Sequence, residues 1–228
     1  MKYRYLFFDM DNTLFDFDAD EDQALSRLFA DQNVPLTASL KQAYQVFNQG
    51  LWRQYEAGTL RRETLLETRF ATFFKQALGL TVDGQALSQN YLDHLALGHD
   101  LMPQSRQLLT RLAQEDVALY VTTNGVAHTQ YQRLHDAKLR PYFKDIFISE
   151  ELGCQKPDPN YFKAVFKQIG DIQLDQALVI GDSLTSDVQG GQNVGVATAW
   201  YNPSGLVNPS PTIKPTHEIR TLMDLLMV

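Results

Sequence analysis

Residues 5–14 read YLFFDMDNTL, and this stretch predicts the first strand of a parallel β-sheet. The apolar, aromatic run Tyr5–Phe8 stops abruptly at Asp9, as a strand does when it is buried on both faces. Open α/β sheets bind their ligands beyond the carboxyl ends of the strands. Asp9 and Asp11 are therefore placed where such a sheet carries its chemistry.

The second half of the chain alternates between predicted strands and predicted helices. The predicted strands are residues 117–122, 146–149, 177–180 and 197–200, and the predicted helices are 105–112, 125–137, 159–169 and 186–194. This alternation is typical of right-handed βαβ units and a parallel sheet covered on both faces. We therefore predict an α/β fold, a doubly wound parallel sheet with a Rossmann-like core that includes Tyr5–Phe8.

The segment between these regions has a different character. It contains helical stretches and no convincing strand; the stretches are 24–31, 40–55, 64–78 and 85–97. We predict that residues 16–98 form a helical insertion after the first strand, and that residues 1–15 and 99–228 form the core that contains the sheet. An acidic run, Asp16 to Asp22, is interpreted as a helix start rather than a metal site, because acidic side chains stabilise helix N-termini.

Composition excludes several classes of protein. The 228 residues are 44% apolar and 21% charged, as in an ordinary globular protein. A net charge of −7 argues against a non-specific nucleic-acid binder. The single cysteine, Cys154, cannot form an internal disulfide, and the longest apolar run, Val117–Val121, is far too short to span a bilayer. We expect a cytoplasmic protein with no membrane or nucleic-acid partner.

Polar residues follow four of the predicted strands. They are Asp9 and Asp11, Thr123-Asn124-Gly125, Lys156, and Asp182 with Asp187 one turn later. Carboxylates crowded at 4 Å repel by about 4 kcal/mol per pair at an effective dielectric near 20, so the group calls for a cation. Oxygen ligands without His or Cys suit Mg²⁺. None of the five histidines lies at a predicted strand end, so zinc is disfavoured.

These residues resemble the four motifs of the haloacid dehalogenase-like hydrolase superfamily. Asp9–Leu14 reads DMDNTL and is similar to the first motif. Thr123 matches the second motif, Lys156 the third, and Gly181–Asp187 the fourth. The resemblance covers the whole chain, and the helical insertion stands where the superfamily has its cap. It implies that residues 16–98 form a helical cap and that residues 1–15 and 99–228 form the catalytic core.

The resemblance implies a phosphatase that works through an aspartyl-phosphate. Asp9 would be the nucleophile, and Asp11 would protonate the leaving oxygen and later deprotonate the attacking water. Thr123 and the backbone N–H of Asn124 would hold phosphoryl oxygens. Lys156 would neutralise both the nucleophile and the phosphate.

The resemblance also implies a metal site. The Mg²⁺ ligands would be the side chains of Asp9 and Asp182 and the backbone carbonyl of Asp11, with Asp187 in support. Mn²⁺ could substitute for Mg²⁺. A carboxylate can approach a phosphate dianion only if that charge is offset, so the metal and Lys156 are both needed for the attack.

Other activities of the superfamily fit the sequence less well. A haloacid dehalogenase attacks carbon and generally lacks the second aspartate of the first motif, so Asp11 argues for phosphoryl chemistry. Sugar phosphomutases typically have glycine where this chain has Asn12. A non-catalytic binding protein would usually have lost a motif residue, and none is missing.

Within the superfamily, the chain resembles the noncanonical pyrimidine 5′-nucleotidases. The stretches that carry this resemblance are Leu6–Phe17, Leu51–Gly58, Thr123–Gly125, Ile148–Gly153 and Ala199–Asn202. They imply an enzyme, a pyrimidine nucleoside 5′-monophosphatase acting on dUMP, UMP or dTMP. Its partner would be a small-molecule phosphomonoester, and the chain would be a monomer or a weak dimer.

Two alternatives remain open at this stage. One is a phosphatase for phosphoglycolate or a sugar phosphate on the same core, and the other is a non-catalytic protein that binds a phosphate ligand. In the predicted cap, Trp52 and Tyr55 either stack a base, with Arg53 contacting a polar edge, or pack the cap's own core.

Overall fold

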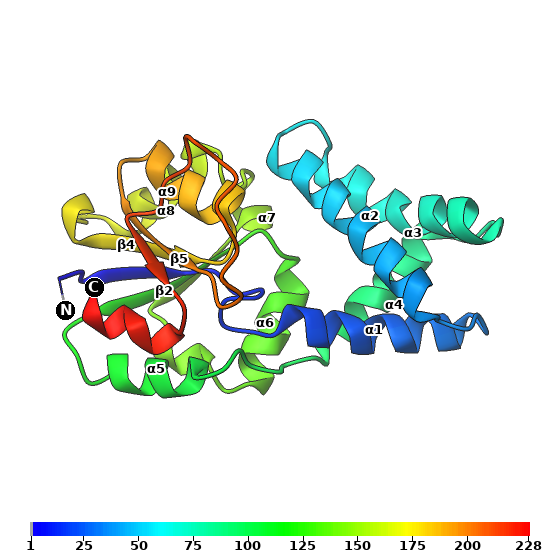
Figure 1. Ribbon diagram of the computed structural model, residues 1–228, viewed down its shortest axis with the longest axis horizontal. Coiled ribbons are helices and arrows are strands. Elements are labelled where there is room, and N and C mark those ends of the chain that lie inside the picture. The colour runs from blue at the N-terminus through cyan, green and yellow to red at the C-terminus, as the bar shows by residue number, and fades with distance from the viewer. Residues whose placement is uncertain (1) are drawn as a thin grey trace. The chain divides into compact units, whose positions relative to one another are not determined.

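A computed structural model describes residues 2–228, which divide into two compact units (Figure 1). The first, called the sheet unit here, comprises the chain up to Phe17 together with His99–Val228. The second, called the helical unit, is Asp18–Gly98. Each unit has its own buried core and is described separately.

The sheet unit contains a six-stranded parallel sheet with the order β3-β2-β1-β4-β5-β6. The strands are β1 Tyr5–Phe8, β2 Ala118–Thr123, β3 Asp145–Ile148, β4 Ala177–Gly181, β5 Ala197–Tyr201 and β6 His217–Ile219. Phe8 of β1 pairs with Val121 of β2 and Ile180 of β4, so the strand order reverses around β1. The predicted α/β fold with a doubly wound parallel sheet is confirmed, and ligands bind at such a reversal.

Helices cover both faces of this sheet, with α5 on one side and α8 and α9 on the other (Figure 1). The α-helices are α5 Ser105–Leu112, α6 Ala127–Asp136, α7 Ser149–Leu152, α8 Pro159–Ile169 and α9 Gln189–Asn193. Short turns are η1 Arg140–Tyr142, η2 Leu174–Gln176, η3 Leu184–Val188 and η4 Leu222–Met227. Side chains of β1 alternate between the faces: Phe8 packs with Leu108 of α5, whereas Phe7 packs with Phe162 of α8.

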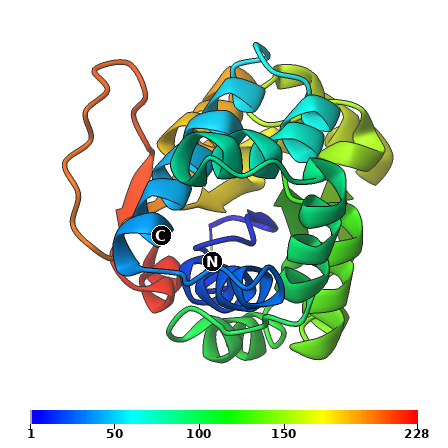
Figure 2. The same cartoon turned by 90° about the vertical axis from the view of Figure 1, so that its right-hand side faces the viewer.

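Local sequence signals explain most of these boundaries. Asp158 caps α8 by accepting a hydrogen bond from the N–H of Asn160 at 2.8 Å, and Pro159 occupies the first turn, where its missing N–H costs nothing. The long loop between β5 and β6, residues 202–216, contains four of the nine prolines and runs out from the sheet (Figure 2). The short strand β6 follows this loop and was not predicted.

The prediction of one continuous helix over residues 186–194 is wrong. A π-helical turn, Leu184–Val188, comes first, and α9 begins only at Gln189. The carbonyl of Ser183 accepts hydrogen bonds from the N–H groups of both Asp187 and Val188, which widens the turn. Such π-turns are frequent at functional sites, and this one carries Asp187.

The helical unit has four helices, and residues 18–98 contain no strand. They are α1 Phe17–Asp31, α2 Ala38–Glu56, α3 Arg62–Leu78 and α4 Gly84–Ala96. Asp18 and Asp20 fall in the first turn of α1, which confirms that the acidic run starts a helix. Aromatic rings fill the core, with Tyr44 stacked on Phe70 at 5.1 Å between ring centroids. Across residues 2–228, none of the helices combines the length and apolar character that a membrane crossing requires.

Candidate active site

A tight turn follows β1 and carries the first motif. The N–H of Asp9 still bonds to the carbonyl of Ile180 at 2.8 Å, so Asp9 stands at the last rung of the sheet. The carbonyl of Met10 then accepts hydrogen bonds from three successive N–H groups, which curls the chain back. Asn12 adopts the left-handed region at φ 57°, which asparagine tolerates better than most residues. The turn thereby separates Asp11 from Asp9.

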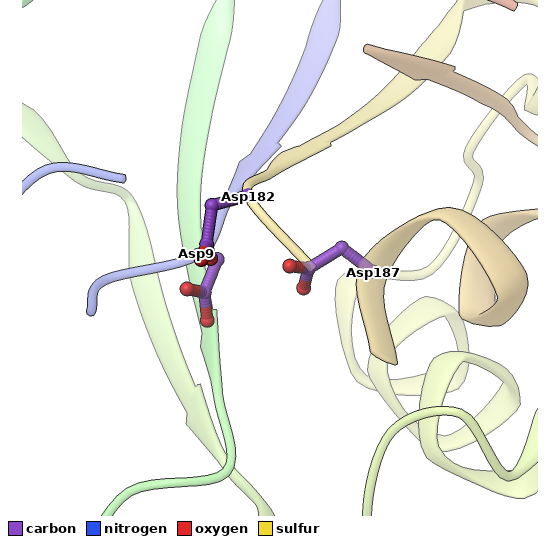
Figure 3. A group of neighbouring side chains, drawn as sticks. All are labelled: Asp9, Asp182 and Asp187. Carbon is purple, nitrogen blue, oxygen red and sulfur yellow. The ribbon is translucent and has the colours of Figure 1, made fainter. Parts of the chain in front are cut away.

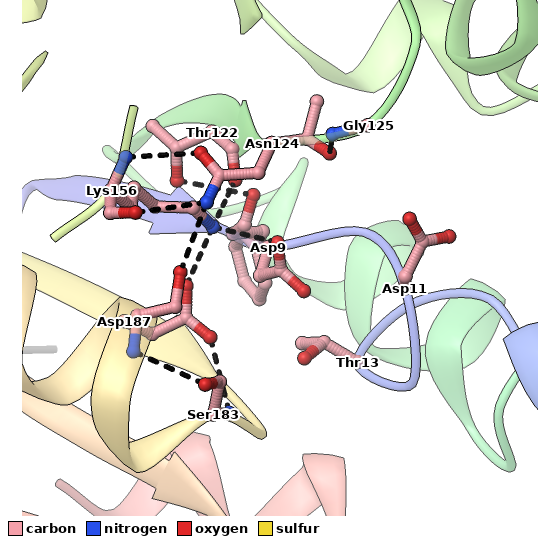
Figure 4. Close-up of polar contacts among 12 residues, drawn as sticks. Asp9, Asp11, Thr13, Thr122, Asn124, Gly125, Lys156, Ser183 and Asp187 are labelled. Atoms are coloured by element: carbon pink, nitrogen blue, oxygen red, sulfur yellow. Dashed lines mark hydrogen bonds and ion pairs between the residues drawn. The ribbon is translucent and has the colours of Figure 1, made fainter. Parts of the chain in front are cut away.

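Three carboxylates meet at the carboxyl edge of the sheet. Asp9, Asp182 and Asp187 each offer an oxygen, and these oxygens lie within 4.8 Å of one another (Figure 3). Lys156 lies beside them, fully buried (Figure 4). Its Nζ donates to Asp9 Oδ1 at 2.7 Å, to Asp187 Oδ1 at 2.6 Å and to the carbonyl of Thr122 at 2.8 Å. All three hydrogens of the ammonium group are used.

Burial and mutual repulsion shift the pKa values of this cluster. Desolvation raises the pKa of Asp9 to about 8, although the charge of Lys156 opposes the shift. Desolvation, together with the charges of Asp9 and Asp187, raises the pKa of Asp182 well above its usual range. Burial alone would lower the pKa of Lys156, but the carboxylates of Asp187 and Asp9 raise it above its usual value.

This charge balance fits a divalent cation. When all four groups are ionised, three carboxylates face one ammonium, which leaves two negative charges uncompensated. Carboxylate oxygens are hard ligands of the kind that Mg²⁺ prefers, and the cluster contains no His or Cys. The residues present are therefore suited to Mg²⁺, and Asp9 and Asp182 are its candidate side-chain ligands.

Two further residues shape this edge, and we did not single them out in the sequence for that role. A Cβ at Gly181 would collide with the carboxylate of Asp187, so only glycine leaves room for that side chain. Trp200 Nε1 donates to the carbonyl of Asp182 at 2.8 Å and so fixes the loop after β4. The Ala199–Asn202 stretch marked the position of Trp200, but nothing in it signalled this contact.

The end of β2 brings the predicted phosphate-binding residues to the same edge. Asn124 exchanges two hydrogen bonds with the backbone of Lys156: its Nδ2 donates to the carbonyl at 2.9 Å, and its Oδ1 accepts from the N–H at 3.0 Å. Thr123 Oγ1 accepts from the N–H of Gly125 and from Gln130 Nε2, both at 3.0 Å. Both of its lone pairs are then occupied, so the Thr123 hydroxyl is left to act as a donor.

Asp11 lies on the loop beyond Asp9, outside the hydrogen-bonded group around Lys156 (Figure 4). Arg133 NH1 donates to its Oδ1 at 2.5 Å, and Gln130 Nε2 donates to its Oδ2 at 2.8 Å. Sequence reasoning did not find Gln130 and Arg133. Their only signal was the spacing of three along α6, which puts both on one face of a helix.

Fold and site together describe a phosphoryl-transfer hydrolase with an α/β core. The chain belongs to the haloacid dehalogenase-like hydrolase family, whose model matches residues 3–195. It is a phosphatase of this family, a phosphoric monoester hydrolase whose relatives include pyrimidine 5′-nucleotidases. The resemblance drawn from the sequence is thereby confirmed.

Three relatives match over almost the whole chain. The HAD-hydrolase YfnB of Bacillus subtilis is 47% identical over 98% of this chain and 94% of its own. The magnesium-bound crystal structure of YfnB superimposes on this chain with a TM-score of 0.93 and covers 100% of this chain and 98% of that one. The pyrimidine 5′-nucleotidase PynA of Streptococcus pneumoniae is 40% identical over 99% of this chain and 94% of its own. The pyrimidine 5′-nucleotidase YjjG of Escherichia coli is 34% identical over 98% of this chain and 99% of its own.

Proposed function

We propose that this phosphatase hydrolyses pyrimidine nucleoside 5′-monophosphates, such as UMP, dUMP and dTMP, with Mg²⁺ as its cofactor. The observation that carries the chemistry is the buried ammonium of Lys156 between Asp9 and Asp187, next to Asp182. The substrate class is supported by the near full-length matches to two relatives named pyrimidine 5′-nucleotidases. YfnB, crystallised with magnesium, supports the choice of metal.

In the proposed reaction, an oxygen of Asp9 attacks phosphorus and the bond from phosphorus to the 5′-oxygen breaks. Asp11 gives its proton to that oxygen, so the nucleoside leaves as a neutral alcohol. Water then attacks the phosphorus of the aspartyl-phosphate and Asp11 takes a proton back, which releases inorganic phosphate and restores Asp9. The free hydroxyl hydrogen of Thr123 and the backbone N–H of Asn124 bind phosphoryl oxygens during both steps.

Charge compensation is what this site has to supply. Lys156 is held by Asp9, Asp187 and the Thr122 carbonyl, so its positive charge stays beside the nucleophile throughout. The side chains of Asp9 and Asp182 and the backbone carbonyl of Asp11, with Asp187 in support, would hold Mg²⁺, and the bound ion would supply the remaining positive charge.

We also propose that the helical segment 16–98 acts as the cap of this enzyme and that residues 1–15 and 99–228 form its catalytic core. Within the helical unit, the rings of Trp52 and Tyr55 meet edge to face at 5.7 Å between centroids. Tyr55 is buried, whereas Trp52 is only half-buried. Core packing therefore accounts for Tyr55, and Trp52 is the better candidate for contact with a base.

A substrate panel tests the proposal. Phosphate release with Mg²⁺ is measured for UMP, dUMP, dTMP, AMP, phosphoglycolate and hexose phosphates, with Asp9→Asn as the inactive control. We expect kcat/KM to be highest for the pyrimidine monophosphates. Preference for phosphoglycolate or hexose phosphates would keep the chemistry and contradict the substrate. Ligand-induced stabilisation without any phosphate release would instead favour a binding protein.

A further inference from the structure

We propose that Arg133 and Gln130 of α6 are positioning residues that fix the carboxyl group of Asp11 for proton transfer. The inference rests on the proposed role of Asp11 as the general acid. It adds two residues to the machinery, neither of which belongs to the four motifs. Both act through Asp11 and need not touch the reacting phosphate.

The geometry of Arg133 is that of a fixed clamp. Its side chain is completely buried, and its guanidinium lies 4.8 Å from the ring centre of Phe15. NH1 donates to Asp11 Oδ1 at 2.5 Å and to Gln130 Oε1 at 2.9 Å. The stacked ring, the carboxylate and the amide hold the guanidinium from three directions. A side chain held in this way is a rigid support for a neighbour that is more exposed to solvent.

Asp11 is such a neighbour. It sits on the turn after β1, with its side chain 30% exposed, and the contacts that hold its carboxylate come from Arg133 and Gln130. The two donors take separate oxygens, so together they fix both the place and the plane of the carboxyl group. A proton donor displaced by 1 Å can cost about 10²-fold in rate, so this orientation matters for catalysis.

The orientation of the Gln130 amide is forced by its partners. The guanidinium of Arg133 can only donate, so it must face Oε1 of Gln130. The Nε2 end then faces Asp11 Oδ2 at 2.8 Å and Thr123 Oγ1 at 3.0 Å, and both of these atoms accept. One amide therefore sets the proton donor and the phosphate-binding hydroxyl relative to each other. A Cβ at Gly125 would collide with this amide, which gives that glycine a reason to be there.

The leaving group distinguishes a role in proton transfer from a role in folding. An alkyl phosphate such as UMP expels a basic alkoxide and needs the proton from Asp11. An aryl phosphate such as 4-nitrophenyl phosphate expels a stable phenolate and needs little help. For both esters kcat/KM reports the steps up to departure of the leaving group, so the comparison isolates the first proton transfer.

The test measures kcat/KM for both esters with the full-length enzyme and Mg²⁺. Arg133→Met is expected to lose about tenfold or more on UMP, or on the best alkyl ester of the panel, and less than about threefold on 4-nitrophenyl phosphate. Arg133→Lys is expected to recover part of the loss, because it keeps the charge but not the planar fork. Gln130→Ala should likewise lose more kcat/KM on the alkyl ester than on 4-nitrophenyl phosphate. Arg106→Met is the matched control, since Arg106 binds the Ala137 carbonyl at the end of α6 and makes no contact with Asp11 in the structure.

The reference variant is Asp11→Asn, for which we expect a loss of about 10²-fold or more on the alkyl ester alone. If Asp11→Asn shows this selectivity and Arg133→Met and Gln130→Ala do not, the positioning role is wrong and the proposed function stands. If Asp11→Asn loses both activities equally, the acid role of Asp11 fails and the positioning role fails with it. Equal loss on both esters in Arg133→Met and Gln130→Ala would also contradict the inference.

Discussion

The sheet unit and the helical unit both bury charged side chains, but they compensate those charges in different ways. In the sheet unit, Lys156 bonds directly to two carboxylates and Arg133 to a third. In the helical unit, the buried Arg69 bonds to the hydroxyl of Ser88 and lies over the rings of Phe70 and Tyr91, at 5.0 Å and 4.7 Å.

Glu21 is one of the buried acids of the helical unit. It accepts from Asn48 Nδ2 at 3.2 Å and from the hydroxyl of Tyr91 at 3.3 Å, and burial raises its pKa. Polar atoms of this interior, among them the Tyr44 hydroxyl and Arg69 Nε, have no hydrogen-bond partner in the structure. The buried Lys156 and Arg133 of the sheet unit thus pair directly with carboxylates, whereas the buried Arg69 and Glu21 of the helical unit are held by neutral groups. The following variants test that difference in order of expected effect.

Lys156→Met should have the largest effect on stability. It leaves Asp9 and Asp187 buried without their shared cation, and breaking a buried pair in this way typically costs about 3–5 kcal/mol. Urea unfolding in EDTA measures the loss, and added Mg²⁺ should restore part of it. A decrease of less than about 1 kcal/mol in the free energy of unfolding would contradict a stabilising role for Lys156 between these carboxylates.

Arg69→Met should cost less, about 1–3 kcal/mol, because it removes packing and cation–π contacts but leaves no carboxylate without its partner. The same unfolding measurement in EDTA applies, and Mg²⁺ should not change the difference from the unsubstituted protein. A cost equal to that of Lys156→Met would show that the two interiors rely on their cations to the same degree.

Removal of metal should make stability fall as pH rises. Asp9 and Asp182 have pKa values above the unfolded value of 3.8, so their contribution is complete below about pH 4. It is lost as pH rises through the folded value, which for Asp9 is about 8. In EDTA we expect Tm to fall by on the order of 4 °C between pH 5 and 9. Asp182→Asn should flatten this slope, and saturating Mg²⁺ should abolish it. A slope that neither change affects would contradict the attribution of the pH dependence to Asp9 and Asp182.

Glu21→Gln should have the smallest effect, about 1 kcal/mol or less. Because the pKa of Glu21 is raised in the fold above its ordinary value of 4.5, its contribution is complete below about pH 4.5 and is lost as pH rises through the folded pKa. The variant should therefore match the unsubstituted protein near pH 4 and be the more stable of the two at pH 8. Urea unfolding at the two pH values checks this, and a destabilised variant at pH 8 would reverse the expected sign.

Sequence reasoning predicted the fold well where a local rule applied. The apolar run Tyr5–Phe8 became β1, and Asp158-Pro159 started α8, because a buried strand and a capped helix each have a local signature. The meeting of Asp9, Asp182 and Lys156 followed from topology, since parallel strands present their carboxyl ends at one edge. Their catalytic roles stay predictions.

Other features had no local signal. The π-turn at Leu184–Val188 depends on where the Ser183 carbonyl finds its donors, and β6 has only three residues. Arg133 and Asp11 are 122 positions apart, so their contact exists only in the folded chain. Within α6, a buried arginine looks the same as a solvated one when only the sequence is read.

Covalent labelling of Asp9 is the most direct test of the proposed chemistry. UMP carrying ³²P in its phosphate is mixed with the enzyme and Mg²⁺, quenched in acid within one turnover, and digested. We predict hydroxylamine-labile label on the peptide that contains Asp9, and neither label nor turnover in Asp9→Asn. Turnover that persists in Asp9→Asn, or label carried by a different residue, would contradict nucleophilic attack by Asp9.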